Sequence, residues 1–213
     1  MAQKFEIMPP RNAERVLLHC CCAPCSSAIV EALLERDIEP VLYYYNPNIF
    51  PEAEYLKRKD ECMRFAKIKG LACVDADYDH GSWLAKIRGL ESEPERGKRC
   101  LECFKCRLLK AAEYARENSI GVFATTLASS RWKDLAQIQS AGLYAQGKTG
   151  VVFWAQNWRK GGLQQRRNSL IKEYDFYNQL YCGCEFSMLN GSNRAPAHLK
   201  PDQHDGPQTK NAP

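Results

Sequence analysis

Four of the eleven cysteines in this 213-residue chain lie within six consecutive positions. Cys20, Cys21, Cys22 and Cys25 follow a short apolar run and precede a segment with helical spacing. Pro24 suits the first position of a helix, so the thiols are predicted on a strand-to-helix turn. A helix N-terminus favours negative charge, and the thiolate is the form of cysteine that binds metals. The stretch therefore indicates metal or redox chemistry, rather than a run of small buried core residues.

A second group reads Cys-x-x-Cys-x-x-Cys and consists of Cys100, Cys103 and Cys106. Residues three apart share a face of a helix, so Cys100 and Cys103 can bind one centre. Structural zinc sites favour two well-separated Cys-x-x-Cys pairs, whereas iron–sulfur clusters accept less regular spacing. The spacing favours iron–sulfur over zinc and leaves zinc as the alternative.

A third group is the Cys182-Gly183-Cys184 sequence. Glycine allows the backbone to bend tightly, so the two thiols can close a small, strained and oxidising disulfide. The same pair could instead supply two ligands to a second iron. Cys62 and Cys73 fall on a predicted helix and a predicted strand, and both are assigned to the core.

Composition sets the expected compartment and class. The formal net charge of +5 permits a nucleic-acid partner without requiring one. The sequence up to Arg15 lacks the apolar segment of a secretory signal, and no apolar run reaches the length of a membrane span. We therefore expect a cytoplasmic protein that does not enter a membrane. In the cytoplasm, clustered cysteines usually serve metal or redox chemistry rather than structural disulfides.

Hydrophobic periodicity predicts the elements that position these thiols. The predicted strands are 15–19, 41–45, 71–77, 121–127 and 151–154, and the predicted helices are 24–36, 51–70, 83–90, 100–118 and 134–146. This alternation favours an α/β fold: a single Rossmann-like (HUP-like) three-layer domain with a mostly parallel sheet of about five strands. The active crevice of such a sheet lies at the carboxyl ends of its strands, where the first cysteine group is predicted. We expect this domain to span 1–189 and 190–213 to be a disordered tail.

Two predictions concern helix faces. In helix 51–70, Leu56, Met63 and Ala66 share a face that is expected to be buried. One further helical stripe is predicted from Leu163, Leu170, Tyr174, Tyr177 and Tyr181.

Other segments carry weaker signals. Thr125, Thr126, Ser130 and Lys133 follow a strand and could bind an anion, although an ordinary capping turn explains them equally well. Aromatic and basic side chains also alternate after the fifth strand, which suits an unstacked nucleotide or a solvated basic loop. This second set consists of Trp154, Trp158, Arg159, Lys160, Arg166 and Arg167. His19 is expected to be a packed residue or a support for the site.

A series of short motifs, spread over about 15–187 and kept in order, resembles the QueH-type epoxyqueuosine reductases. The motifs are Leu17-Leu18-His19 with Cys21-Cys22-Ala23-Pro24-Cys25-Ser26, Tyr45-Asn46-Pro47-Asn48-Ile49 with Glu54-Tyr55, Gly89-Leu90-Glu91 with Glu95 and Gly97, Arg99-Cys100 with Cys103-Phe104 and Arg107-Leu108, Thr125-Thr126-Leu127 with Ser130 and Lys133, and Tyr181-Cys182-Gly183-Cys184 with Phe186-Ser187. The chain departs from the family pattern in the extra thiols Cys20 and Cys106 and in Asn157-Trp158.

The resemblance implies reduction of epoxyqueuosine to queuosine at the wobble position of transfer RNA, the last step of queuosine biosynthesis. The partners are then the anticodon loop of that RNA and an external electron donor. It implies a [4Fe–4S] cluster and an additional mononuclear iron as cofactors. The residues matched to these roles are Cys21, Cys22, Cys100 and Cys103 for the cluster, Cys25 for the additional iron, Cys182 and Cys184 for the redox-active pair, and Tyr45, Asn46, Thr125, Thr126, Ser130 and Lys133 for the substrate.

Two other function classes fit parts of the sequence. A non-catalytic RNA-binding module stapled by zinc would use the same cysteines and basic residues. A thioredoxin-like thiol oxidoreductase is disfavoured, because its Cys-x-x-Cys should follow an early strand whereas Cys100 comes late.

Overall fold

The central strand of the molecule is the apolar run that precedes the first cysteine group. The computed structural model describes residues 6–179 and 181–189, so the predicted tail 190–213 lies outside the described residues. Five parallel strands form one sheet in the order β3-β2-β1-β4-β5. The strands are β1 (Arg15–His19), β2 (Glu39–Tyr44), β3 (Cys73–Asp75), β4 (Val122–Thr125) and β5 (Val152–Phe153). Val16, Leu17 and Leu18 are fully buried, as expected for a parallel strand covered on both faces.

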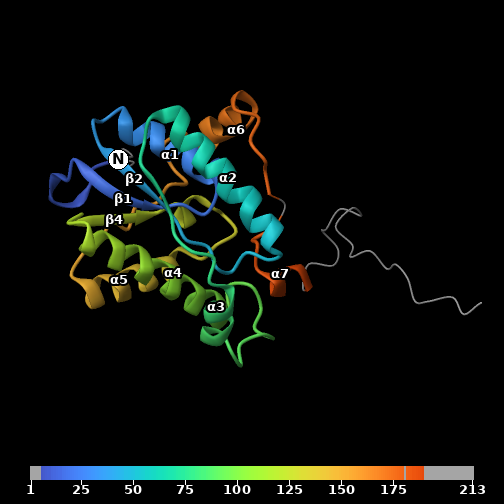
Figure 1. Ribbon diagram of the computed structural model, residues 1–213. Helices are drawn as coiled ribbons and strands as arrows, with labels where there is room; N and C mark the ends of the chain where they lie inside the picture. Colours follow the sequence, from blue (N-terminus) through green and yellow to red (C-terminus); the bar gives the residue numbers. More distant parts are fainter. Residues whose placement is uncertain (1–5, 180, 190–213) are drawn as a thin grey trace, which may run out of the picture.

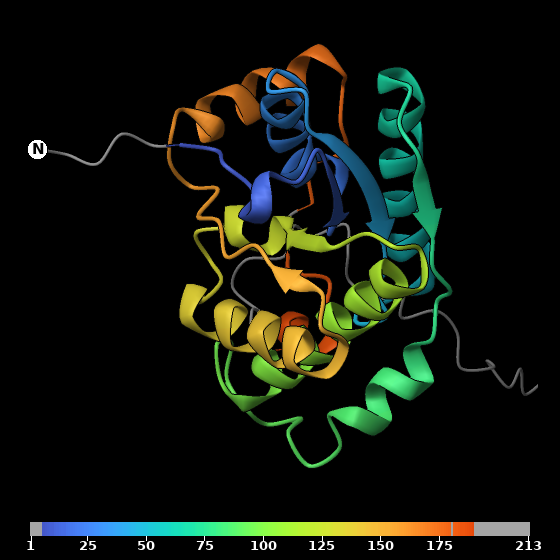
Figure 2. The same cartoon turned by 90° about the vertical axis from the view of Figure 1, so that its left-hand side faces the viewer.

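Helices cover both faces of the sheet, so the predicted three-layer α/β architecture is confirmed (Figure 1, Figure 2). The helices are α1 (Ala23–Leu34), α2 (Glu52–Lys69), α3 (His80–Lys86), α4 (Lys98–Glu117), α5 (Leu135–Thr149), α6 (Leu163–Glu173) and α7 (Glu185–Leu189), with 3-10 turns η1 (Pro10–Asn12) and η2 (Thr126–Ser129). Helices α1, α2 and α6 form one layer, while α4 and α5 pack together in the other. The short α3 packs on α4.

Helix α2 has the predicted bounds but not the predicted buried face. It ends at Gly70, whose φ of 66° is a left-handed conformation that glycine adopts at low cost. Its buried residues are Tyr55, Arg58, Cys62, Phe65 and Ala66, whereas Leu56 is 42% exposed. Apolar spacing gives no sign that Arg58 is buried. Its guanidinium is buried against the Glu54 carboxylate, with an Nε to Oε1 distance of 2.7 Å.

The helix predicted from the late aromatic stripe was too long. Helix α6 stops at Glu173, and Asp175 has a φ of 49°, which turns the chain out of the helix. Tyr177 and Tyr181 follow in an irregular segment, where their hydroxyls donate to the carboxylate of Glu54 and to the Phe50 carbonyl. The stripe therefore reflects packing of this segment beside the start of α2, not a continuous helix.

Two glycines of α5 test how tightly this helix packs against Phe153 of the edge strand β5. A Cβ at Gly142 would lie 2.2 Å from the Phe153 ring, whereas a Cβ at Gly147 would meet nothing within 4 Å. Gly142→Ala is expected to lower the free energy of unfolding by about 1–3 kcal/mol, because overpacking forces the ring to move. Gly147→Ala should instead raise it by up to about 1 kcal/mol through helix propensity. Urea denaturation of both variants checks this, and equal effects would contradict the packing.

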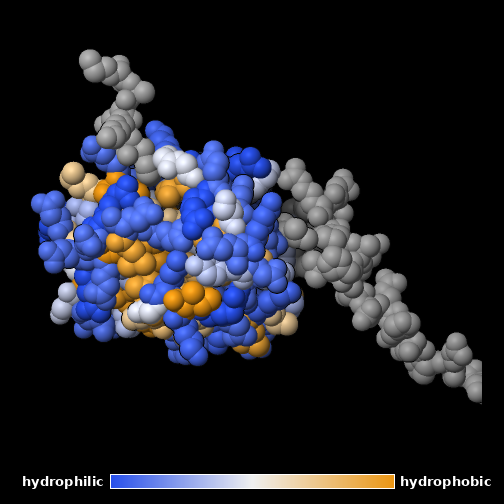
Figure 3. Space-filling model, turned by 90° about the horizontal axis from the view of Figure 1, so that it is seen from above, coloured by the Kyte–Doolittle hydropathy of each residue, from blue (hydrophilic) through white to orange (hydrophobic). Residues whose placement is uncertain are grey.

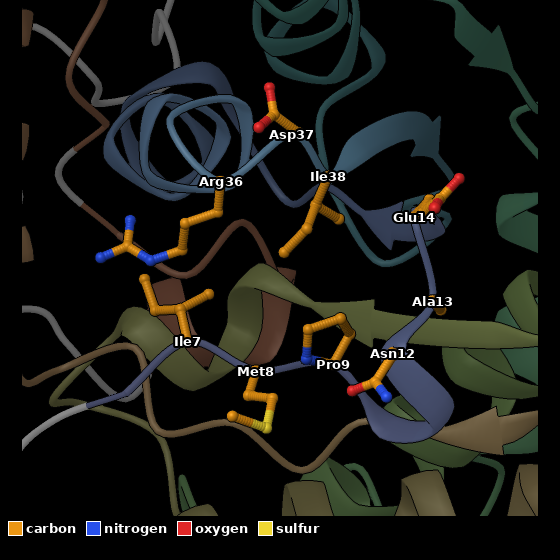
Figure 4. A pocket seen from close by; sticks show the side chains of 9 residues that line it. All are labelled: Ile7, Met8, Pro9, Asn12, Ala13, Glu14, Arg36, Asp37 and Ile38. Carbon is orange, nitrogen blue, oxygen red and sulfur yellow. The ribbon is translucent and has the colours of Figure 1, made fainter.

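Among the described residues, no helix combines the length and apolarity needed to cross a bilayer. The face seen in Figure 3 shows hydrophobic residues gathered in small groups among hydrophilic ones. Figure 4 shows a hollow lined by residues that precede β1 and β2, including Met8, Glu14 and Arg36. This hollow lies at the amino ends of the strands, so it is on the opposite edge of the sheet from the cysteine turn.

Candidate metal and redox site

The candidate site begins where β1, β2 and β4 end side by side. His19, the last residue of β1, pairs with Tyr43 in β2 and with Thr125 in β4. Its Nδ1 lies 2.8 Å from the Thr125 hydroxyl and its Nε2 lies 3.1 Å from the Tyr45 carbonyl. Burial, together with the nearby Arg107 cation, lowers the pKa of His19 to about 3, so the ring is neutral. His19 is therefore a packed residue that ties the three strand ends together, as predicted.

Asn46 and Arg107 hold the cysteine turn against the neighbouring strand end. The Asn46 amide donates to the Cys20 carbonyl at 2.9 Å, and its own carbonyl accepts from the Arg107 guanidinium. Both side chains are buried. A buried, charge-assisted network of this kind fixes the backbone from which the next thiols project.

Cys21, Cys22 and Cys25 bring their sulfurs together at the start of α1. All three Sγ atoms lie within 4.8 Å of one another, and those of Cys21 and Cys22 are 3.9 Å apart. Within 6–179 and 181–189 this is the one group of three or more metal-ligating side chains found at such spacing. Three soft sulfur donors at one helix N-terminus can hold a thiophilic metal, which is the chemistry that the sequence predicted.

Hydrogen bonds concentrate negative charge on one sulfur of this trio. Bonds from Cys22 and Cys25 lower the pKa of the Cys21 thiol, and the Thr126 hydroxyl, at 3.3 Å, acts in the same direction. Burial raises the pKa of Cys22, and the bond to Cys21 raises that of Cys25 to about 12. Gln179 donates to the Cys22 sulfur at 2.9 Å. Among the three thiols, deprotonation is therefore most favoured at Cys21.

The second and third cysteine groups lie close to each other. Cys103 and Cys184 share a buried cluster with Trp83 and Ile87. Cys100 is partly buried, and its sulfur accepts from the Arg96 backbone N–H at 3.3 Å. Burial raises the pKa of Cys100, and the negative charge of Cys182 adds to this. Cys100 and Cys103 therefore lie near Cys182 and Cys184 but outside the close trio.

Lys133 links Cys182 with the trio. Its Nζ lies 2.9 Å from the Cys182 sulfur, and its charge also acts on Cys21. Burial alone would raise the pKa of the Cys182 thiol, but the Lys133 ammonium and the Arg107 guanidinium outweigh it and lower that pKa. Burial and the charge on Cys182 raise the pKa of Cys184 to about 12. The Lys133 ammonium therefore favours the thiolate on Cys182, whereas burial favours the thiol on Cys184; both are free cysteines.

Removing the Lys133 charge tests this arrangement. In Lys133→Met, burial acts on Cys182 with less opposition, so the pKa of Cys182 should rise and its thiolate population at pH 7 should fall. We expect iodoacetamide labelling of Cys182 at pH 7 to slow on the order of tenfold. Peptide mass spectrometry across a pH series measures it. Lys105→Met, which removes a lysine paired with Glu102, is the matched control. The same labelling profile in wild type and Lys133→Met would contradict the ion pair.

Comparison with known proteins identifies the family. A profile of the family described as Epoxyqueuosine reductase QueH matches residues 16–190. Proteins with this name from Histophilus somni and Haemophilus influenzae are 49% and 48% identical to the chain, over 84% and 90% of its length and 74% and 78% of theirs. One from Acinetobacter baylyi is 43% identical over 90% of the chain and 88% of the relative. The chain belongs to the QueH family of epoxyqueuosine reductases.

The remaining cysteines of this QueH-family chain occupy other places. Cys20 is fully buried and its thiol donates to the Leu18 carbonyl at 3.2 Å, so it faces the core rather than the trio. Cys62 is buried and Cys73 half-buried, in line with their assignment to the core. Cys106 is partly buried beside Tyr45, and burial raises its pKa.

Most residues that the QueH resemblance matched to substrate support the thiols in this structure. Thr125 holds His19, Thr126 contacts Cys21, Tyr45 offers its carbonyl to His19, and Lys133 pairs with Cys182. Ser130 contributes a backbone carbonyl to the Arg159 guanidinium. A direct substrate contact for any of these side chains stays a prediction.

The predicted aromatic–basic nucleotide surface is wrong for its tryptophans. Trp154 and Trp158 are buried and pack edge to face, with ring centroids 5.2 Å apart, so neither ring can stack on a base. Arg166 binds the Glu31 carboxylate on α1. Sequence analysis also missed Gln179 and Arg96 as partners of the thiols, because neither stands in a motif with metal-ligand spacing.

Proposed function

We propose that this chain reduces epoxyqueuosine to queuosine at the wobble position of transfer RNA, as the last step of queuosine biosynthesis in the cytoplasm. The observation that carries the proposal is the placement of Lys133 between the Cys21, Cys22 and Cys25 trio and Cys182, in a chain that belongs to the QueH family. In this reaction the two carbon–oxygen bonds of the epoxide break, a carbon–carbon double bond forms, and the oxygen leaves as water. The step consumes two electrons and two protons.

Cys182 and Cys184 can supply both electrons, with one proton from the Cys184 thiol and the other from the proton that Lys133 and Cys182 share. When the two thiols become a disulfide, they release the two-electron equivalent that the epoxide needs, and an external donor then restores the dithiol. Gly183, with a φ of 102°, allows the short turn between them, and its carbonyl is held by the Phe50 N–H at 2.8 Å. The Lys133 ammonium beside Cys182 provides N–H donors for negative charge that develops on the epoxide oxygen.

The residues proposed to hold metal are Cys21, Cys22, Cys100 and Cys103 for a [4Fe–4S] cluster and Cys25 for an additional iron. The close trio supports a sulfur-liganded centre, because three thiols meet within 4.8 Å. When bound, such a centre supplies single electrons and a Lewis-acidic iron. Arg107 and Lys133 offset the negative charge of its thiolate ligands, since both cations act on Cys21.

Transfer RNA would present the modified nucleotide from its anticodon loop. Chemistry on a base requires that the base leave its stack, and unpaired loops allow this at low cost. The external reductant is the second partner. It must reach Cys182, which is partly exposed.

Metal content and activity, measured on the same anaerobic preparation, test this function. We expect brown protein that contains iron and sulfide and converts epoxyqueuosine in transfer RNA to queuosine, as read by nucleoside mass spectrometry. Dithionite can serve as the electron source. Colourless, air-stable protein with stoichiometric zinc, bound RNA and no conversion would instead identify a zinc-stapled RNA-binding module.

A further inference from the structure

Two arginines hold every backbone carbonyl of the short loop 130–133. Arg96 donates from Nε to the Trp132 carbonyl at 2.9 Å and from Nη2 to the Arg131 carbonyl at 3.4 Å. Arg159 donates from Nη2 to the carbonyls of Ser130 and Lys133, both at 2.5 Å. Charge-assisted bonds from both sides leave this loop little freedom to rearrange.

The clamped loop presents two neighbouring side chains in different directions. Lys133 points inward, with its ammonium 2.9 Å from the Cys182 sulfur. Trp132 lies at the surface with 59% of its area exposed, whereas Trp83, Trp154 and Trp158 are no more than 5% exposed. Trp132 is therefore the one exposed tryptophan of the four in the chain.

We propose that Trp132 is a stacking platform for an unpaired nucleobase next to the nucleotide that enters the crevice. This inference rests on the proposed function, and it names a residue that positions the RNA. Trp132 precedes Lys133 on the clamped loop, so a base stacked on its ring would be held by the same loop that carries the partner of Cys182. Indole rings stack on any base through its π face, and single-stranded loops expose such faces.

Two features of the loop suit this role. The Arg131 guanidinium lies 5.2 Å from the Trp132 ring centroid, where it can orient the ring and also reach a phosphate. The loop is already rigid, so little conformational entropy is lost when RNA binds.

The charged residues near Trp132 favour base stacking over a phosphate-binding patch. The cations Arg96, Lys98 and Arg131 are exposed there, but Glu93 and Glu95 lie in the same segment. The negative charge of Glu95 reaches as far as Cys182. Affinity from phosphate contacts alone would therefore be weak. Stacking on an aromatic ring would supply binding free energy that the mixed charges do not.

The single exposed tryptophan makes binding directly visible. Acrylamide should quench mainly Trp132 in the complete wild-type protein, because the other three rings are buried. Saturation with a synthetic anticodon stem-loop RNA is expected to protect this emission from acrylamide. Trp132→Phe should lack the acrylamide-accessible part of the tryptophan emission even without RNA, which would assign that emission to Trp132.

Two variants measure the contribution to RNA binding. Trp132→Ala is expected to raise the Kd for the stem-loop by about 5- to 150-fold. Trp132→Phe should raise it by less, since a phenyl ring still stacks. With dithionite as donor, the loss should appear in KM for the RNA rather than in kcat. Tyr144→Ala is the matched control, because this half-exposed ring also has cations beside it, Lys105 at 5.5 Å and Lys148 at 5.8 Å, but lies on α5.

The outcomes separate this inference from the proposed function. Unchanged RNA affinity in Trp132→Ala, or unchanged quenching on RNA saturation, would overturn the platform even if the wild type reduces epoxyqueuosine. An equal loss in Tyr144→Ala would also overturn it. RNA protection of Trp132 without any epoxide reduction would support the platform while refuting the reductase function.

Discussion

Cys182→Ser is expected to stop multiple turnover and to leave the bound metal in place. The Cys182 thiolate is stabilised by Lys133 at 2.9 Å, so it is the first sulfur able to form a bond during reduction. A serine hydroxyl cannot form a disulfide with Cys184, so the two-electron equivalent is lost. We expect steady-state queuosine formation to fall at least about a thousandfold, a loss of the size seen when a nucleophile is removed.

The measurement needs two readouts on one sample. Nucleoside mass spectrometry follows queuosine, while iron content and the visible spectrum follow the metal centre. Cys184→Ser should give the same loss of turnover, because both thiols are needed for the disulfide. Cys73→Ser, which alters a half-buried thiol on β3, should retain activity. Loss of the brown colour in Cys182→Ser would make Cys182 a metal ligand and refute its assignment as the redox thiol.

The elements of the fold were predictable where apolar residues alone decide burial. The bounds of β1 follow directly from hydrophobic spacing, and the structure confirms them. Helix α2 departs from this rule because the Glu54 carboxylate compensates the buried charge of Arg58. Periodicity assigns no such pairing, so Leu56 was placed inside instead.

The site was predictable as an inventory of thiols but not as a set of contacts. Spacing placed Cys21, Cys22 and Cys25 on one turn, and the structure brings their sulfurs together. The pairing of Lys133 with Cys182 joins residues 49 positions apart, and that of Gln179 with Cys22 joins residues 157 apart. No local pattern encodes such contacts, because they depend on how α6 and the segment after it return across the sheet edge. The division of ligands between cluster and additional iron stays a prediction.

Cys20 and Cys22 provide the sharpest test of the metal site, because Cys22 belongs to the sulfur trio whereas the Cys20 thiol donates to the Leu18 carbonyl. Cys22→Ser is expected to remove most of the bound metal, since it deletes one of three sulfurs that meet within 4.8 Å. Changes in residues that merely support metal ligands cost about 10- to 100-fold in affinity, so loss of a direct ligand should cost at least as much. Metal analysis and the visible spectrum of anaerobic protein measure the loss.

Cys20→Ala is the matched control for this loss. Its thiol donates to the Leu18 carbonyl at 3.2 Å and faces the core rather than the trio, so its sulfur is not placed to act as a ligand. The variant should keep its metal and lose only a small amount of stability, because one buried sulfur is removed. If Cys20→Ala instead lost its metal while Cys22→Ser kept it, the turn would have to present the opposite neighbour to the metal. The ligand assignment drawn from this geometry would then be wrong, and with it the orientation of the α1 N-terminus toward the centre.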